Sequence, residues 1–400
     1  MSRSIFVVLF LVFLTASCII IIQPAKASAD SWVTKAPMPS AEPGGVAVAL
    51  NGEIYVIGPS FNYVYNPPTN TWVSKTPIPT HQQSFAVAAY QNKIYVFGGC
   101  SSFNQITGYP INCTGANEEY NPATDSWETK APMPTARAEM QANVVNGKIY
   151  VISGTISSGS ISNATEVYDP TRDSWSTASP IPTPVGLYTS AVVDNKIYVE
   201  GGGKSGPVIT DLNQIYDPIT NVWTLGAPLP TPGLLAAAGA TTGVFAPTRL
   251  YVIGGTADGI NALNTTHIYD PQTNSWTIGA SMPTARGFLS VAVVNDTLYA
   301  LGGTNNLLNP QAPTNAVNEQ YFPVGYGELS PSYSNTPTTS PSTSQGTMIY
   351  YVITAVVVII IIVAVAVTLS LRRRHSSVSA RSTVALEGRA LNVLPACSNT

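Results

Sequence analysis

The sequence predicts an all-β fold, and three observations point to it. Only 10% of the residues are charged, whereas Gly (31), Pro (32) and Tyr (20) are plentiful. Tyrosine favours strands, and glycine and proline favour tight turns, so this composition is typical of many short strands separated by many turns. Apolar residues at a helical spacing are scarce in most of the chain, and short alternating runs bounded by turn residues recur instead.

The N-terminus has the features of a secretory signal. Arg3 precedes an apolar run over residues 5–22, and a stretch of small residues ends at Ala29. A positive charge, an apolar core and a small-residue end predict cleavage after Ala29, so residues 1–29 would be a signal peptide. An uncleaved anchor and a lipid attached at Cys18 are the alternatives.

A second apolar block predicts a membrane anchor near the C-terminus. Residues 349–371 carry no charge and are followed at once by three arginines, residues 372–374. At about 1.5 Å per residue this block would cross a hydrocarbon core of about 30 Å. Because basic clusters mark the cytoplasmic side, the sequence predicts a transmembrane helix over residues 348–371 and a cytoplasmic tail over residues 372–400. We therefore expect a single-pass plasma-membrane protein with its N-terminal domain outside.

The charge of the exported part argues against nucleic acid as a partner. Residues 30–347 contain 20 acidic and 11 basic side chains, which gives a net charge of −9. A nucleic-acid-binding domain usually carries a basic patch or stripe. The expected partners are therefore a cell-surface protein or glycan, together with the membrane.

Two of the four cysteines lie in the exported part. Cys100 and Cys113 belong to one predicted loop in an oxidising compartment, so we expect a disulfide between them. Free thiols are the alternative.

A repeat of about 50 residues organises the exported part. Each of the six tryptophans lies in a similar context; they occupy positions 32, 72, 127, 175, 223 and 276. Five of them follow a Tyr-(Asp/Asn)-Pro turn, and a proline-rich turn follows each. A strand-like run then ends, in most units, in a two-residue turn of Asn, Asp, Gln or Gly and leads into a strand such as KIYVFGG. Each unit thus supplies four antiparallel strands, which bury both faces only when units stack around an axis.

The two ends of the exported part are predicted to share one unit. The sixth unit stops at EQYFPVGYGE without a tryptophan strand, while DSWVTK at residues 30–35 is nearly identical to DSWETK at residues 125–130. We therefore expect the N-terminal strand to complete the sixth blade and to close the ring, which removes exposed strand edges.

These motifs resemble the kelch family: a paired glycine, a tyrosine and a tryptophan at fixed offsets in units of about 50 residues. The resemblance covers residues 30–323, with Ser153 and Pro59 each replacing one paired glycine. It implies a six-bladed kelch-type β-propeller of four-stranded antiparallel blades, which we place at residues 30–326.

Modification sites are predicted around the propeller. Residues 327–347 are rich in Ser, Thr and Pro and predict an extended stalk, with O-glycosylation as an option. Four sequons would be surface loop sites for N-glycans in a host that glycosylates; their asparagines are Asn112, Asn163, Asn264 and Asn295.

The longer connections predict a binding face. In such blades the connections from strand 2 to strand 3 share one face with the interblade segments, and loops on a rigid scaffold are where recognition usually lies. The long connections are residues 100–117, 154–164, 203–212, 256–265 and 304–317.

Four polar residues are candidate ligand contacts near this face. Arg137 and Arg286 begin innermost strands, so their guanidinium groups are expected at the mouth of the central channel, where they would hold an anionic or polyhydroxylated ligand. His81 occupies the related stretch PTHQQS. Glu200 replaces an apolar residue of the other five units and needs a partner. The structural alternatives stay open: arginines bonded to loop carbonyls, Glu200 paired with Arg or Lys204, and a plain loop histidine.

The favoured function is a cell-surface binding or adhesion module without catalysis, cofactor or metal. Kelch-like copper oxidases need several histidine ligands, and only His81 and His267 lie in the predicted propeller. A sugar-processing enzyme of the kelch epimerase type is one alternative; it would need an acid or base at the channel, for which Glu200 and the two arginines are the candidates. A structural cell-envelope protein is the other.

Overall fold

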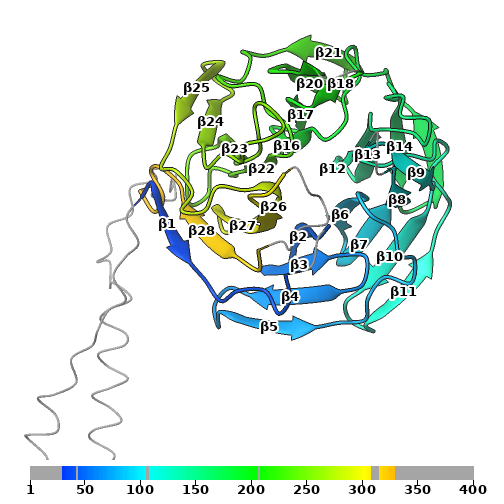
Figure 1. Ribbon diagram of the computed structural model, residues 1–400, viewed down its shortest axis with the longest axis horizontal. Helices are drawn as coiled ribbons and strands as arrows, with labels where there is room; N and C mark the ends of the chain where they lie inside the picture. Colours follow the sequence, from blue (N-terminus) through cyan, green and yellow to red (C-terminus); the bar gives the residue numbers. More distant parts are fainter. Residues whose placement is uncertain (1–28, 42–43, 105–107, 206–207, 308–314, 329–400) are drawn as a thin grey trace, which may run out of the picture. The chain divides into compact units, whose positions relative to one another are not determined.

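The computed structural model describes residues 29–41, 44–104, 108–205, 208–307 and 315–328, and all regular structure in these ranges is β-strand. Six four-stranded antiparallel sheets surround a common axis as the blades of a propeller (Figure 1). No helix within these ranges has the length and apolar character that a membrane span requires. The predicted signal peptide, transmembrane helix and cytoplasmic tail, and nearly all of the stalk, lie outside the described residues.

Blades 1 to 3 each run from an inner first strand to an outer fourth strand. Blade 1 consists of β2 (Val46–Leu50), β3 (Glu53–Ile57), β4 (Asn62–Asn66) and β5 (Thr71–Ser74). Blade 2 consists of β6 (Ala86–Tyr90), β7 (Lys93–Phe97), β10 (Asn117–Asn121) and β11 (Ser126–Thr129). Blade 3 consists of β12 (Gln141–Val145), β13 (Lys148–Ile152), β14 (Thr165–Asp169) and β15 (Ser174–Thr177).

Blades 4 and 5 follow the same order, and blade 6 takes its last strand from the N-terminus. Blade 4 consists of β16 (Thr189–Val193), β17 (Lys196–Glu200), β20 (Asn213–Asp217) and β21 (Val222–Leu225). Blade 5 consists of β22 (Ala237–Ala240), β23 (Leu250–Ile253), β24 (Thr266–Asp270) and β25 (Ser275–Ile278). Blade 6 consists of β26 (Gly287–Val294), β27 (Thr297–Thr304), β28 (Asn318–Phe322) and β1 (Ser31–Thr34).

The predicted closure of the ring is confirmed. The N-terminal strand β1 pairs antiparallel with β28, and Trp32 is the register partner of Tyr321. Figure 1 shows β1 along the outer side of β28, so segments from both ends of the propeller form one sheet. The outermost strand of blade 6 is thus supplied by the first described residues of the chain.

The repeated Tyr, Asp/Asn and Trp fasten each blade to the preceding one. In blade 2 the hydroxyl of Tyr120 donates to Asp125 Oδ1 (2.5 Å), and the backbone N–H of Thr76 donates to the same oxygen (2.9 Å). The indole of Trp127 then donates to the carbonyl of Thr76 (2.9 Å). Asp125 itself has a left-handed backbone (φ 51°), which Asp and Asn tolerate better than most residues. These contacts explain why each unit keeps the three residue types.

Apolar side chains pack between neighbouring blades rather than in one central core. Six buried clusters alternate with the six blades. Between blades 1 and 2, for example, Ile57 and Val64 pack with Phe85 and Val87. Each blade therefore buries its two faces only against its neighbours, as the repeat predicts.

One connection departs from the tight turns of the other blades. Residues 241–249 join β22 to β23 as a longer loop, and the carboxylate of Asp296 in blade 6 binds this loop. Asp296 accepts hydrogen bonds from the backbone N–H groups of Thr242 (2.7 Å), Val244 (3.0 Å), Phe245 (2.7 Å) and Ala246 (3.1 Å). The loop is thereby attached to the neighbouring blade.

Candidate ligand-binding site

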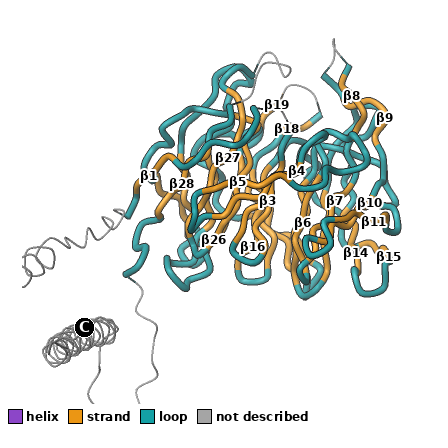
Figure 2. The backbone as a smooth tube through the Cα atoms, turned by 90° about the horizontal axis from the view of Figure 1, so that it is seen from below, coloured by secondary structure: helices purple, strands orange, loops and turns teal. Residues whose placement is uncertain are grey.

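The long connections gather on one face of the propeller. Two small hairpins, β8 (Cys100–Phe103) with β9 (Pro110–Cys113) and β18 (Gly203–Lys204) with β19 (Val208–Ile209), extend the second-to-third connections of blades 2 and 4. Figure 2 shows the propeller edge-on with these hairpins on the side opposite the tight turns. We call this side the long-loop face.

A series of backbone hydrogen bonds links blades 2 to 6 around the axis at this face. In these five blades one residue at the start of the first strand has a left-handed backbone, and in blades 3 to 6 its N–H donates to the equivalent carbonyl of the preceding blade. The bonds run from Glu139 to Ser84 (2.9 Å), from Leu187 to Glu139 (3.1 Å), from Leu235 to Leu187 (3.1 Å) and from Phe288 to Leu235 (3.0 Å). We call these five residues the mouth ring; they come from blades 2 to 6.

The mouth ring combines a polar arc with an apolar arc. On the polar side Thr155 Oγ1 donates to Glu139 Oε2 (2.6 Å), and burial raises the pKa of this carboxyl despite the hydroxyl donor. The apolar side consists of Leu187, Leu235 and Phe288, in blades 4 to 6. Phe288 is exposed, with 40% of its surface accessible to solvent. This arrangement suits a ligand that pairs an apolar group with a hydrogen-bonding group.

The structure corrects the predicted placement of two candidate residues. Arg137 and Arg286 are fully buried, and their guanidinium groups do not lie open at the mouth. Arg137 Nη1 lies 2.5 Å from Glu166 Oε2, and Arg286 Nη2 lies 2.6 Å from Glu319 Oε2. Both arginines also donate to a neighbouring loop carbonyl, that of Thr135 (3.2 Å) or Thr284 (3.3 Å), as the structural alternative expected. Both guanidinium groups are paired within blades 3 and 6 and present no free charge to a ligand.

Glu200 and His81 lie in very different surroundings. Glu200 ends β17 with 1% exposure, and neither carboxylate oxygen has a hydrogen-bond partner among the described residues. Burial raises the pKa of Glu200 well above its ordinary value. The expected partner, Arg or Lys204, is therefore not found within the described part of the chain. His81 is exposed, with Nδ1 2.9 Å from the carbonyl oxygen of Pro59, which fits a loop residue.

The two cysteines lie opposite each other but are free thiols in the structure. Cys100 of β8 and Cys113 of β9 are register partners, which places them at the base of the same hairpin. Burial raises the pKa of Cys100 to about 12. The predicted disulfide is thus not formed here, although the pairing of the two positions is the expected one.

All four sequon asparagines are exposed, as a glycosylation site requires. Asn163 and Asn264 occupy equivalent positions on the long-loop connections of blades 3 and 5, and Asn112 lies on β9. Asn295 lies in the tight turn between β26 and β27, on the opposite face.

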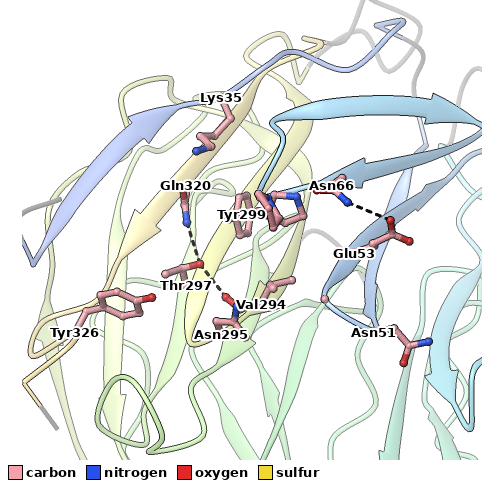
Figure 3. A pocket seen from close by; sticks show the side chains of 13 residues that line it. Lys35, Asn51, Glu53, Asn66, Val294, Asn295, Thr297, Tyr299, Gln320 and Tyr326 are labelled. Carbon is pink, nitrogen blue, oxygen red and sulfur yellow. Dashed lines mark hydrogen bonds between the residues drawn. The ribbon is translucent and has the colours of Figure 1, made fainter. Parts of the chain in front are cut away.

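The opposite face carries a second candidate site, an open groove of about 490 Å³ between blades 6 and 1. In blades 2 to 5 a basic residue at the start of the second strand, or just before it in blade 5, forms an ion pair with an acid of the third strand; the pairs are Lys93–Glu119, Lys148–Asp169, Lys196–Asp217 and Arg249–Asp270. Blades 1 and 6 replace this pair by Asn66 with Glu53 (3.4 Å) and by Gln320 with Thr297 (3.0 Å), both drawn in Figure 3. The groove is therefore lined by amide and hydroxyl groups together with the Glu53 carboxylate and Lys35.

Within the described residues no group of three or more His, Cys, Asp or Glu side chains is arranged to bind a metal ion.

Comparison with family models places these observations in a known family. The KLHDC2/KLHL20/DRC7 Kelch-repeats domain matches residues 44–234 and 119–303, which together cover more than half of the chain. The chain belongs to the kelch-repeat family. The solved "Structure of YjhT" is similar to this propeller with a TM-score of 0.59, covering 70% of this chain and 95% of that chain at 17% sequence identity. At that identity the likeness concerns the fold.

The sequence alone did not reveal the residues of the mouth ring. The five residues of the mouth ring share no side-chain type, so no motif marks them. Their common property is the left-handed backbone at one repeat position. Glu139 and Phe288 come two residues after Arg137 and Arg286 in the two PTAR motifs, so this spacing was the available signal.

Proposed function

We propose that this kelch propeller is a cell-surface binding module that recognises a protein or a glycan at the mouth ring of its long-loop face. The kelch fold itself supports a protein-binding role. The observation that carries the choice of face is the exposed Phe288, which is bonded to Leu235 in the mouth ring, with Leu187 and Glu139 following in the next blades. Aromatic side chains next to a few fixed polar groups are typical of binding hot spots and sugar sites.

Bonds between the long connections of neighbouring blades support this placement. Cys113 N donates to the hydroxyl of Ser157 (2.8 Å), so the hairpin of blade 2 is bonded to the loop of blade 3. Asn261 and Asn306 form a bridge between the loops of blades 5 and 6. A rim built from bonded loops is preorganised, which lowers the entropy cost of binding.

The experiment is a screen of the purified full-length chain on protein and glycan arrays, followed by variants of the mouth ring. Phe288→Ala is expected to weaken the ligand found by at least about tenfold, because hot-spot truncation typically costs more than 1 kcal/mol. Ile219→Ala is the matched control, since Ile219 is 77% exposed on the opposite face. Unchanged affinity in Phe288→Ala would remove the mouth ring as the site.

The same screen separates the alternatives. A sugar that is converted rather than bound would favour the enzyme of the epimerase type, with Glu139 or Glu200 as the buried acid. Self-association without a ligand would favour a structural envelope protein.

The cellular placement belongs to the same proposal. The N-terminal signal segment and the apolar block at residues 349–371 support an extracytoplasmic propeller on a single C-terminal membrane anchor. Protease treatment of intact cells should then remove the propeller and leave the tail protected; a protected propeller would contradict this orientation.

A further inference from the structure

The interface between blades 4 and 5 departs from the repeat in the second-strand residue that precedes the paired-glycine position. This residue is apolar in the other five blades: Ile57, Phe97, Ile152, Ile253 and Leu301. In blade 4 it is Glu200, buried and without a hydrogen-bond partner on either oxygen. An ionised carboxylate in such a place costs several kcal/mol unless it is paired.

The same interface lacks the arginine that blades 3 and 6 bury. The carbonyls of Arg137, Arg286 and Gly233 each accept a hydrogen bond from the second-glycine position of the preceding blade, which shows that the three residues are equivalent. The register of the third strand likewise makes His267 the equivalent of Glu166 and Glu319. Blade 5 therefore has Gly233 and His267 where its sister blades have a buried Arg–Glu pair.

Glu200 and His267 face the same interface at the same level. Tyr198 of β17 and Tyr269 of β24 contact each other there, with ring centroids 5.8 Å apart. Glu200 lies two residues after Tyr198, and His267 two residues before Tyr269 on an oppositely directed strand, so both side chains lie on the contacting faces. His267 Nδ1 is also buried without a hydrogen-bond partner within the described residues.

Small residues leave room beside these two groups. A Cβ at Gly233 would have the Leu229 side chain at 3.7 Å as its nearest neighbour, which is an ordinary contact. Ala236 stands where four other blades place a large side chain: Phe85, Met140, Tyr188 and Leu289. Gly233 is also partly exposed, although Glu200 and His267 are buried.

We propose that this interface binds the guanidinium group of a small molecule, with Glu200 as its carboxylate partner and neutral His267 as a second acceptor. The precedent lies in the same chain, since Arg137 and Arg286 place a guanidinium at the equivalent position and pair it with a carboxylate at 2.5 and 2.6 Å. A guanidinium is planar, delocalised and weakly hydrated, so it tolerates burial beside a carboxylate better than other cations. The site is separate from the mouth ring, and its test does not depend on the proposed function.

The test uses the purified full-length chain with methylguanidinium as the probe and N-methylurea as its neutral analogue. We expect methylguanidinium at millimolar concentrations to raise Tm with the logarithm of its concentration, and N-methylurea to leave Tm unchanged. Glu200→Leu, which installs the apolar residue type of the other blades, should weaken methylguanidinium at least about 30-fold in calorimetry. Glu139→Gln removes the carboxylate of the mouth ring and should leave probe binding unchanged.

A second variant places the guanidinium within the chain itself. Gly233→Arg should raise Tm and abolish methylguanidinium binding, because its own side chain would occupy the space beside Glu200. The proposal is overturned by equal binding of N-methylurea, by no measurable binding of methylguanidinium, or by binding that persists in Gly233→Arg. Loss of binding in Glu139→Gln alone would instead assign the probe to the mouth ring.

Discussion

Trp32 of β1 packs on Tyr321 of β28 with ring centroids 5.0 Å apart, across the seam that joins the two ends of the propeller. The indole Nε1 also donates to the carbonyl of Ala280 in the preceding interblade segment (2.9 Å). The hydroxyl of Tyr321 donates to Asp30 (2.7 Å), so the first described residues bind blade 6 through side chains as well as through the strand ladder.

Removing this seam should destabilise the whole ring. We expect deletion of residues 30–36 to lower Tm strongly. The outer edge of β28 is then left unpaired, and the hydrogen bonds of Trp32 and Asp30 to Ala280 after blade 5 are lost. Trp32→Ala should cost about 2 kcal/mol, less than a fully buried tryptophan, since its ring is half-buried. Val33→Ala on the same strand is the control, being 41% exposed, and should change stability little. A deletion variant with the parental Tm would contradict the closure as a stabilising feature.

The buried Arg137–Glu166 pair predicts a strong asymmetry between single and double variants. Arg137→Val leaves the Glu166 carboxylate buried with only the Thr135 hydroxyl as a donor, so we expect a loss of about 3 kcal/mol in urea unfolding. The double variant Arg137→Val with Glu166→Gln copies blade 4, which has Val185 and Gln214 at these positions. It should recover most of the loss. Equal stability of the single and double variants would show that the pair is not coupled.

The hydrogen bonds between the Asp296 carboxylate and residues 241–249 predict that the stability of the protein depends on pH. Burial alone would raise the pKa of Asp296, but donation from the backbone N–H groups of Phe245, Thr242 and Ala246 lowers it below the ordinary value of 3.8. Because the folded pKa is depressed, the stabilisation is present above pH 3.8 and is lost as the pH falls through the folded value. We expect Asp296→Asn to cost about 2 kcal/mol at pH 7, and the difference from the parent to shrink below about pH 4. If the stability difference between Asp296→Asn and the parent stayed constant down to pH 2, the ionised carboxylate would not be what binds the loop.

The fold was predictable because the same pattern of strand and turn residues recurs in all six blades. The Tyr, Asp/Asn and Trp of each unit form the same contacts between blades, and the orphan DSW at residues 30–32 matched the strand missing from the sixth unit. The long loop at residues 241–249 was not apparent, since its attachment depends on Asp296, which is distant in sequence.

The candidate site was predicted only in outline, and for a physical reason. The face follows from strand order, whereas the environment of a side chain depends on partners in other strands. Arg137 was expected at the surface because its carboxylate partner Glu166 lies 29 residues away in TEVYD, without any motif to join them. The sequence shows that Glu200 replaces an apolar residue of the other units. That Gly233 and His267 replace a buried Arg–Glu pair becomes apparent only when the blades are compared in the structure.

The hairpin that carries Cys100 and Cys113 gives the last prediction. The two residues are directly opposite in an antiparallel ladder, where Cα atoms lie about 4.5 or 5.5 Å apart, within the range of about 4.4–6.8 Å that a disulfide spans. In protein exported by its host we expect this bond to form, and intact-mass measurement without reductant should show the loss of two hydrogen atoms. Alkylation must be done in denaturant, because burial raises the pKa of Cys100 to about 12 and leaves little thiolate in the native protein.

The bond would close a short loop, so reduction should lower stability by about 3 kcal/mol. Cys113→Ser is the matched control and should show no dependence of Tm on reductant. Two free thiols in freshly exported protein, with a Tm that reductant does not change, would mean that the hairpin pairs the cysteines without oxidising them.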